Sequence, residues 1–210
     1  MQASRVTGLI LSGGRGSRMG GVDKGLQPFR GQALARHALE RLAPQVHSVL
    51  VNANRHAEQY AAWGAPVLPD AAPADFAGPL AGFLSGLRAC RSPWLCTVPC
   101  DTPLFPTDLV ARLGEAAERE GADLAMACAR EDDGRWRPQP VFCLLRSNLA
   151  DSLHAFMQAG GRKIDAWTAQ HACSLVRFDR GSDAPDAFFN ANTLEELRRL
   201  EAGSAQPPSP

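Results

Sequence analysis

The sequence predicts an α/β fold in which a mainly parallel sheet is flanked by helices. Apolar runs of strand length alternate with helical patterns through the first half of the chain, and this order is typical of parallel strands joined by helical crossovers. A glycine-rich loop follows the first apolar run, and polar residues follow the next three. With 210 residues, 45% of them hydrophobic, the chain is long enough to bury a core without disulfides or metals.

The expected strands are short apolar runs bounded by polar or turn-forming residues, and the expected helices are amphipathic stretches between them. Pro79 stands at an early helical position, where proline costs little, and Thr107 is expected to cap the next helix. Thr193 and Glu196 form a capping box at the start of the last helix. We expect strands at 6–11, 46–51, 66–68, 94–98, 123–129, 140–145 and 174–178, and helices at 32–42, 55–63, 79–88, 107–120, 148–158 and from 193 onward.

The chain reads as one domain over residues 1–202, followed by a Ser/Pro-rich tail at 203–210 that we expect to be disordered. Lys plus Arg and Asp plus Glu are 22 each, so the basic surplus of a general nucleic-acid binder is missing. No run approaches a membrane-spanning helix, and the first residues do not resemble a signal peptide. We therefore expect a cytoplasmic protein that binds neither nucleic acid nor membrane.

Six cysteines occur without the close pairing that a zinc site needs. Most lie in apolar, strand-like runs, so we expect buried, reduced thiols. They are Cys90, Cys96, Cys100, Cys128, Cys143 and Cys173.

Polar side chains follow each of the first four expected strands. The carboxyl ends of parallel strands lie at one edge of a sheet, where open α/β folds bind ligands. We therefore expect these side chains to converge on a single site. They are Arg15, Arg18 and Lys24 after the first strand, Asn52 and Asn54 after the second, Asp70 after the third and Asp101 after the fourth.

The glycine-rich loop at 12–25 is typical of an anion site, because closely spaced glycines let backbone N–H groups approach phosphate oxygens. It is no Walker A motif, since no Ser or Thr follows Lys24. Nor is it a dinucleotide fingerprint, since Met19 stands where the third glycine belongs and Asn52 replaces the ribose-binding acid. Together with three basic residues and a preceding buried strand, the loop favours anion binding over a plain surface loop, and an oxidoreductase using a dinucleotide is disfavoured.

Asp101 stands between Pro99 and Pro103, which stiffen its turn. A carboxylate there suits Mg²⁺, which prefers one or two carboxylates together with phosphate oxygens; the alternative is an Asx-type turn residue. Asp70 has a similar alternative as a turn or cap residue. Asn52 fits either the edge of a nucleobase or the backbone of its own loop.

Other candidates are weaker. The pair Arg135 and Arg137, and the pair Arg162 and Lys163, each fit a second anion or plain solvated charge. The five histidines show no metal-ligand spacing, and the chain lacks the Gly-x-Ser-x-Gly elbow of a hydrolase. The segment 190–193 leads into the last helix and has helix capping as its simple explanation.

Six motifs in order resemble the bacterial molybdenum cofactor guanylyltransferase family, and the likeness runs from Val6 to about Leu200. The Arg-Met-Gly-x-x-Asp-Lys and Val-Asn-Ala-Asn-Arg motifs together are specific, whereas either alone would not be. The motifs are LSGG at 11–14, RMGGVDK at 18–24, VNANR at 51–55, GPLAG at 78–82, PCDTP at 99–103 and NANT at 190–193.

The resemblance implies a single Rossmann-like nucleotide-binding domain, like that of the nucleotide-diphospho-sugar transferases. It also implies transfer of GMP from GTP to Mo-molybdopterin with Mg²⁺ as cofactor. Apoproteins of molybdoenzymes and other cofactor-biosynthesis proteins are further candidate partners. The implied GTP-binding residues are Leu11, Ser12, Gly13, Gly14, Lys24, Asn52, Asp70 and Asp101, with Lys24 on the phosphates, Asp101 also on the metal, and Asn190 and Asn192 on the pterin side.

Lys24, Asp101 and Arg18 are the expected catalytic residues, because a reaction between two anions needs positive charge rather than a general base. Two alternatives stay open. A cytidylyl- or sugar-nucleotidyltransferase would differ in its choice of base. A non-catalytic molybdopterin carrier would need the pterin side but not the pair of Lys24 and Asp101.

Overall fold

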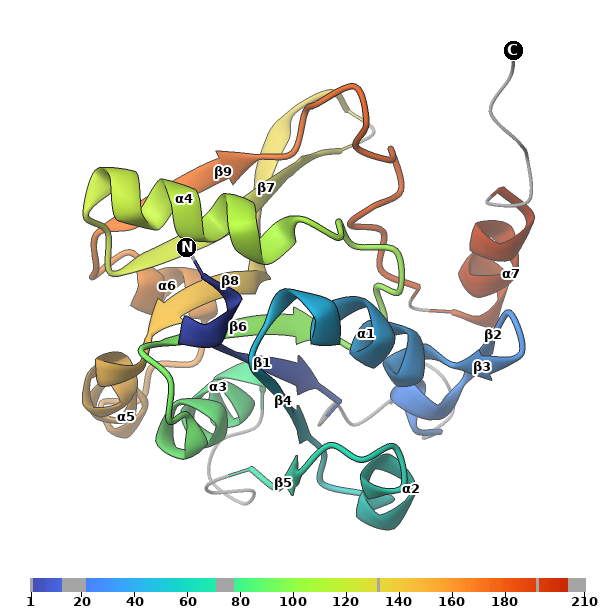
Figure 1. Cartoon of the computed structure of the whole chain (residues 1–210), viewed down its shortest axis with the longest axis horizontal. Helices are drawn as coiled ribbons and strands as arrows, with labels where there is room; N and C mark the ends of the chain where they lie inside the picture. Colours follow the sequence, from blue (N-terminus) through green and yellow to red (C-terminus); the bar gives the residue numbers. More distant parts are fainter. Residues whose placement is uncertain (1, 13–21, 71–77, 132, 192, 204–210) are drawn as a thin grey trace.

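The computed structural model describes residues 2–12, 22–70, 78–131, 133–191 and 193–203. Seven strands form one sheet in the order β5-β4-β1-β6-β8-β7-β9, and β2 and β3 form a separate hairpin (Figure 1). Within the sheet only β8 runs antiparallel to its neighbours, which confirms the expected mainly parallel sheet. The strands are β1 (Val6–Leu11), β2 (Pro28–Phe29), β3 (Gln32–Ala33), β4 (Ser48–Asn52), β5 (Val67–Leu68), β6 (Trp94–Pro99), β7 (Leu124–Arg130), β8 (Trp136–Arg146) and β9 (Cys173–Arg177).

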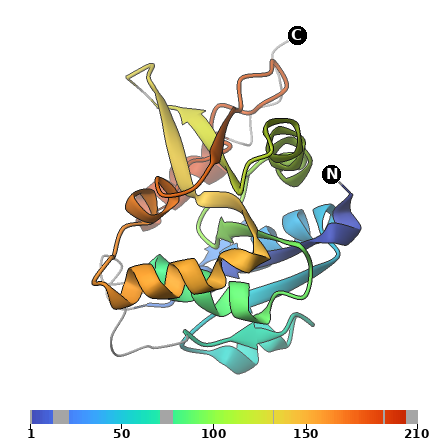
Figure 2. The same cartoon turned by 90° about the vertical axis from the view of Figure 1, so that its left-hand side faces the viewer.

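Helices cover both faces of the sheet, as the view turned by 90° also shows (Figure 2). Helices α1 and α4 lie on one face, and α3, α5 and α6 lie on the other. They are α1 (Leu34–Leu42), α2 (Ala57–Ala61), α3 (Pro79–Ala89), α4 (Leu109–Glu120), α5 (Ala150–Gln158), α6 (Ile164–Thr168) and α7 (Leu194–Gly203).

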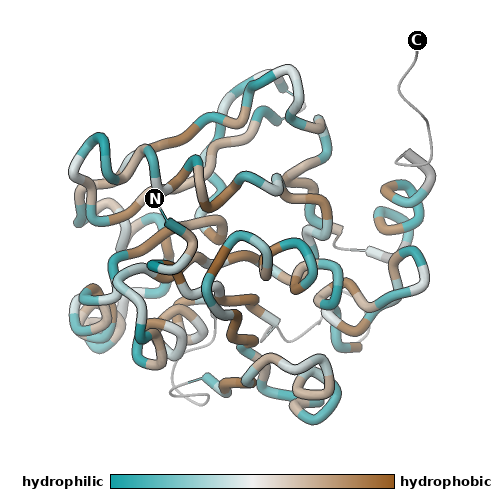
Figure 3. The backbone as a smooth tube through the Cα atoms, in the orientation of Figure 1, coloured by the Kyte–Doolittle hydropathy of each residue, from teal (hydrophilic) through white to brown (hydrophobic). Residues whose placement is uncertain are grey.

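Alternation along the strands divides the apolar core between these two layers. In β1, Val6 and Ile10 face α1 and α4, whereas Leu9 faces α3. The hydrophobic colouring of the central strands in Figure 3 follows from this burial on both faces. The sheet is thus a rigid platform whose strand ends can carry a site.

A third, smaller apolar cluster joins the hairpin β2–β3 to α7. Phe29, Leu34, Leu197 and Leu200 bury their side chains in it. The two segments lie side by side in Figure 1, although they are far apart in sequence. The cluster ties the chain that follows Lys24 to the helix that follows Asn190.

The structure confirms most expected elements and corrects several details. The capping box is present, because the Glu196 carboxylate accepts from Thr193 N at 2.9 Å and Glu196 N donates to Thr193 Oγ1 at 3.1 Å. The expected cap at Thr107 is wrong: α4 begins at Leu109, and the Gln45 side-chain oxygen accepts from Val110 N at 3.1 Å instead.

Strand and helix bounds also differ from expectation. β8 starts at Trp136 rather than at residue 140. The first expected helix, α1, starts at Leu34 rather than at residue 32, because residues 32–33 form β3. The strands β2 and β3 and the helix α6 were not predicted from the sequence. Residues 204–210 of the expected tail lie outside the described residues. Across the described segments, no helix has the length and apolar character needed to cross a membrane.

All six cysteines are free thiols, as expected. Cys96, Cys100, Cys128 and Cys143 are buried, but Cys90 is half-buried and Cys173 is exposed, so burial was overpredicted for those two. Cys173 opens the edge strand β9, which has a neighbour on one side only.

Candidate functional site

The ends of the central strands meet as the sequence predicts. In the parallel register, Leu11 lies beside Asn52 on one side and Pro99 on the other. The loops beyond are joined as well, since Ser12 N donates to Asn52 O at 2.8 Å and Cys100 N donates to Leu11 O at 3.1 Å. Three segments distant in sequence therefore share one edge of the sheet.

Asn52, Asn54 and Asp70 hold one another. The Asp70 carboxylate accepts from Asn52 Nδ2 at 2.9 Å and from Asn54 Nδ2 at 2.7 Å, and Asp70 N donates to Asn54 Oδ1 at 2.8 Å. Asn52 Nδ2 also donates to Leu68 O at 3.2 Å. The cluster fixes the amide of Asn52, whose side-chain oxygen faces α3.

The packing of α3 on this amide is close. A Cβ atom at Gly82 would lie 2.4 Å from Asn52 Oδ1 and 2.6 Å from Leu11 Cδ2. Only glycine leaves room there, which accounts for the last glycine of the GPLAG motif. The helix, the amide and the end of β1 thus form one packed unit.

Lys24 and Asp101 form an ion pair at the same edge, although they lie 77 residues apart. Their side chains are 19% and 17% exposed. Lys24 begins a 3-10 turn, Lys24–Leu26, and Asp101 stands in the turn after β6. The pair places an ammonium group beside the carboxylate that the sequence assigns to a metal.

Asn190 lies next to this pair. Ala191 N donates to Asp101 O at 3.1 Å, and the hydroxyl of Thr102 donates to Asn190 Oδ1. The same hydroxyl is 3.4 Å from Asp101 Oδ1. The expected pterin side and the expected nucleotide side therefore meet at Asp101 and Thr102.

A buried set of hydrogen bonds among Tyr60, Asp23 and Gly25 holds the turn that carries Lys24. The Tyr60 hydroxyl donates to Asp23 Oδ1 at 2.6 Å, and Gly25 N donates to the same oxygen at 3.1 Å. Burial and the bond to Asp23 raise the pKa of Tyr60 well above its ordinary value, so the phenol is a proton donor at physiological pH. Beside them, burial and the charge of Asp101 raise the pKa of Cys100 to about 12, which leaves that thiol protonated and unreactive.

Ser12 belongs to the same buried group. Within the described part of the chain its Oγ is buried and has no hydrogen-bond partner. A Cβ atom at Gly25 would lie 3.2 Å from it. Ser12 therefore packs against the Lys24 turn, close to the Tyr60 hydroxyl and the Cys100 thiol.

Three of these residues were not predicted from the sequence. Thr102 and Asp23 are immediate neighbours of the predicted residues Asp101 and Lys24, and that position was the available signal for them. Tyr60 carried no local signal, because a tyrosine in a short helix is ordinarily read as core. Gly13, Gly14, Arg18 and Asn192 lie outside the described residues.

The donor set at Asp101 fits a magnesium ion that is shared with a nucleotide. Mg²⁺ is typically bound by one or two carboxylates together with phosphate oxygens. Among the residues that the structure describes, no group of three or more His, Cys, Asp or Glu side chains could hold a metal by itself. A metal here would depend on oxygens from the substrate.

The weaker candidates have local roles. Arg137 pairs with Glu131 and Asp133 at the exposed end of the β7–β8 hairpin, and the N–H of Arg135 and the guanidinium of Arg137 lower the pKa of Asp133. Arg162 donates to carbonyl groups at the end of α5, Met157 O among them. These contacts support solvated charge for Arg137 and helix capping for Arg162.

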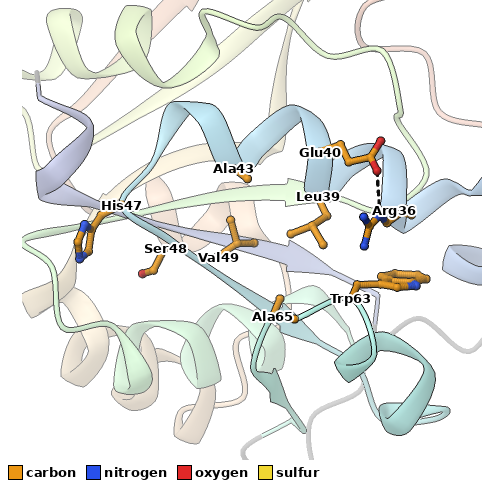
Figure 4. A pocket seen from close by; sticks show the side chains of 10 residues that line it. Arg36, Leu39, Glu40, Ala43, His47, Ser48, Val49, Trp63 and Ala65 are labelled. Atoms are coloured by element: carbon orange, nitrogen blue, oxygen red, sulfur yellow. Dashed lines mark hydrogen bonds and ion pairs between the residues drawn. The ribbon is translucent and has the colours of Figure 1, made fainter.

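A separate pocket of ≈ 350 Å³ lies between α1, the start of β4 and the turn after α2 (Figure 4). Leu39, Val49 and Trp63 line it, and an ion pair of 2.9 Å between Arg36 and Glu40 stands at its rim. It contains none of the residues predicted for the site. The functional candidate is therefore the strand-end edge and not this hollow.

Comparison with known proteins shows the family to which the chain belongs. The MobA-like NTP transferase domain profile matches residues 8–202. A molybdenum cofactor guanylyltransferase of Acidovorax ebreus is 65% identical over 201 residues, which cover 93% of this chain and 95% of that protein. The enzyme of the same name from Methylibium petroleiphilum is 62% identical over 202 residues, with 95% and 97% covered.

Solved structures show the same fold at lower identity. Molybdopterin-guanine dinucleotide biosynthesis protein A from Archaeoglobus fulgidus superimposes with a TM-score of 0.77 at 22% identity, covering 95% of this chain and 98% of that one. A 4-diphosphocytidyl-2C-methyl-D-erythritol synthase from Anaerococcus prevotii gives a TM-score of 0.72 at 10% identity, covering 98% and 100%. The fold is thus that of the nucleotidyltransferases, as the sequence predicts. From the strand-end site, the matching profile and relatives identical at well over half of their positions, the chain is a nucleotidyltransferase that belongs to the MobA-like family and, within it, to the molybdenum cofactor guanylyltransferases.

Proposed function

We propose that this chain transfers GMP from GTP to Mo-molybdopterin, forming Mo-molybdopterin guanine dinucleotide and releasing pyrophosphate. The observation that carries the proposal is the ion pair of Lys24 and Asp101 at the joined strand ends, beside Asn190. A site for two anionic substrates needs a cation and a metal-binding carboxylate where both can reach. The names of the relatives from Acidovorax ebreus and Methylibium petroleiphilum support the same reaction.

The proposed roles divide along the edge of the sheet. The GTP side comprises Leu11, Ser12, Gly13, Gly14, Lys24, Asn52, Asp70 and Asp101, and the pterin side comprises Asn190 and Asn192. Arg18 joins Lys24 and Asp101 as a catalytic residue. In this arrangement the Asn52 amide donates to Asp70 and to Leu68 O, and its oxygen faces α3, so the proposed contribution of Asn52 is to hold Asp70 and the end of β4 in place for the nucleotide.

In the proposed mechanism an oxygen of the molybdopterin phosphate attacks the α-phosphorus of GTP. The bond from that phosphorus to the oxygen bridging the β-phosphate breaks, and pyrophosphate leaves with the electron pair. The attacking phosphate is already ionised near neutral pH, so the residues have no proton to remove. Their task is to reduce the repulsion between two anions.

Lys24 serves this task by exchanging Asp101 for phosphate oxygens when GTP arrives. Asp101, freed from the ammonium group, is the residue that would hold Mg²⁺, together with phosphate oxygens of the nucleotide. When bound, the metal supplies positive charge against the phosphate oxygens and the departing pyrophosphate. Through its hydroxyl, Thr102 holds Asn190 beside Asp101 during these changes.

We also propose GTP and Mo-molybdopterin as the small-molecule partners and molybdoenzyme apoproteins as recipients of the product. A cytoplasmic location fits the six free thiols, because reducing compartments keep thiols from pairing.

The test is calorimetric titration of GTP, CTP and ATP with Mg²⁺, on the unaltered chain, Asp101→Asn and the control Asp133→Asn. Asp133 is an exposed acid that pairs with arginines away from the site. We expect GTP to bind in preference to the others and Asp101→Asn alone to weaken it. Preference for CTP would indicate a cytidylyltransferase. Binding of none of the three nucleotides would favour a non-catalytic molybdopterin carrier. Either result contradicts the proposal.

A further inference from the structure

We infer that Tyr60 is a positioning residue for nucleotidyl transfer: through Asp23, its hydroxyl holds the turn that presents Lys24 to Asp101. The inference rests on the proposed function, because it assigns Tyr60 a role only if Lys24 binds the phosphates. Tyr60 lies on α2, outside every motif that marks the site.

The contact is buried on both sides. Tyr60 is fully buried and Asp23 is 8% exposed. One oxygen of Asp23 accepts both the Tyr60 hydroxyl, at 2.6 Å, and Gly25 N, at 3.1 Å. Lys24 is the residue between Asp23 and Gly25, so this oxygen fixes the backbone on either side of it.

Further bonds make Asp23 the anchor of the whole turn. Leu26 N donates to Asp23 O at 3.3 Å, and Gln27 Nε2 donates to the same oxygen at 3.1 Å. Gln27 N donates to Lys24 O at 3.1 Å. A shift of Asp23 would therefore move Lys24 with it.

The phenol also limits how closely the backbone of the turn can approach, through direct steric contact. A Cβ atom at Gly25 would lie only 2.4 Å from Tyr60 Oη. The backbone at Gly25 thus rests directly on the hydroxyl that holds Asp23. The position of the turn is defined by Tyr60 in two ways, through a hydrogen bond and through steric contact.

Loss of the hydroxyl would leave a buried carboxylate with one donor fewer, and such a group costs free energy until the structure shifts to admit water or another donor. A small displacement of a charged group at a reaction centre can reduce the rate by about 10². We therefore expect Tyr60→Phe, which keeps the ring, to impair the site through Lys24.

The experiment compares Tyr60→Phe, Lys24→Met and the double variant. Thr97→Val is the control, because it removes another buried hydroxyl bond, that of Thr97 to Val141 O at 2.6 Å, inside the sheet. Each variant is assayed for transfer from GTP to molybdopterin and for binding of GTP and of guanosine. Circular dichroism and thermal unfolding confirm that each is folded.

We expect Tyr60→Phe to lower kcat/KM for GTP by about tenfold to 10² and to weaken binding of GTP but not of guanosine, which has no phosphates for Lys24. The double variant should be no slower than Lys24→Met, because Tyr60 acts through Lys24. Thr97→Val should leave transfer unchanged and add nothing to Lys24→Met beyond its own effect.

Unchanged transfer by Tyr60→Phe, equal weakening of GTP and guanosine, or losses that multiply in the double variant would each overturn the inference while leaving the proposed function intact. Full transfer by Lys24→Met would overturn the phosphate role of Lys24 and the inference with it. If Tyr60→Phe does not fold, Gly25→Ala serves instead, because its Cβ would displace the turn from the phenol; GTP binding that survives this change would overturn the inference.

Discussion

The hydroxyl of Thr102 donates to the side-chain oxygen of Asn190, 88 residues further along the chain. Thr102 is fully buried and directly follows Asp101. One hydrogen bond thus connects the residue after Asp101, the proposed metal ligand, to Asn190, which we propose for the pterin side.

Thr102→Val is expected to raise the KM for molybdopterin by about tenfold, the value of one hydrogen bond of roughly 1.4 kcal/mol. The KM for GTP should change less, because the GTP side does not depend on Asn190. Steady-state kinetics with each substrate varied in turn measures both. Thr102→Ser keeps the hydroxyl and should restore most of the loss; equal increases in the two KM values would contradict the assignment.

Lys24→Ala and Asp101→Ala are each expected to lower the turnover number by about 10²–10³, the usual cost of one preorganised electrostatic group. Both should remain folded, since the pair lies at the edge of the sheet, with its side chains 19% and 17% exposed, and not in the core. Single-turnover assays with circular dichroism provide the measurement. Arg36→Ala is the control, because it removes an ion pair at the pocket in Figure 4 and should leave turnover unchanged.

Tyr60 is expected to remain protonated in the native protein above pH ~10, where an ordinary tyrosine ionises. Burial and the bond to Asp23 raise its pKa, and the negative charge of Asp23 acts in the same direction. A raised folded-state pKa contributes stability that is complete below the unfolded pKa and is lost as pH rises above it. The free energy of unfolding should therefore fall in alkali.

The measurement is simple because the chain contains one tyrosine. Tyrosinate absorbance should appear together with loss of the circular dichroism signal, and not before. A native titration near the ordinary tyrosine pKa would show that the phenol is accessible. Tyr60→Phe should remove the absorbance change and reduce the alkaline loss of stability.

Arg112→Met is expected to destabilise the fold by about 3–5 kcal/mol, the cost of leaving one member of a buried ion pair alone. Arg112 donates to both oxygens of Asp183 at 2.7 and 2.9 Å, and its guanidinium lies 3.8 Å from the centre of the Phe178 ring. Denaturant unfolding measures the change. The double variant Arg112→Met with Asp183→Leu should recover part of the lost free energy of unfolding. An equal or larger loss would show that the unpaired Asp183 carboxylate is not the cause of the destabilisation.

The sequence was sufficient for features that depend on local pattern. Buried strands followed by polar residues predicted the shared edge, and Thr193 with Glu196 predicted a cap that forms as expected. The proximity of Lys24 and Asp101 was predicted because both residues follow parallel strands, whose ends must meet; the ion pair between them was not predicted. Each of these inferences needs only neighbours in sequence and one rule of topology.

The remaining features depend on contacts that the sequence does not mark. The residues of β8 read as a strand, but an apolar run carries no sign of its direction, so its antiparallel insertion between β6 and β7 was not predicted. The hairpin β2–β3 has two residues per strand and turns at Arg30 and Gly31, both with positive φ. Such a turn usually carries Asn-Gly or Asp-Gly, and Arg-Gly gave no comparable signal.

The apolar cluster between α7 and the hairpin has a consequence for how the protein is made. During synthesis the ribosome delivers the hairpin early and α7 only after every strand of the sheet. Until then Phe29 and Leu34 lack the cover of Leu197 and Leu200, and Glu201 is not yet available to accept from Arg30 N, a bond of 2.6 Å in the finished fold. The turn that carries Lys24 therefore leaves the ribosome before α7, which supports the adjoining hairpin. We expect the proposed site to form at the last step of folding rather than the first.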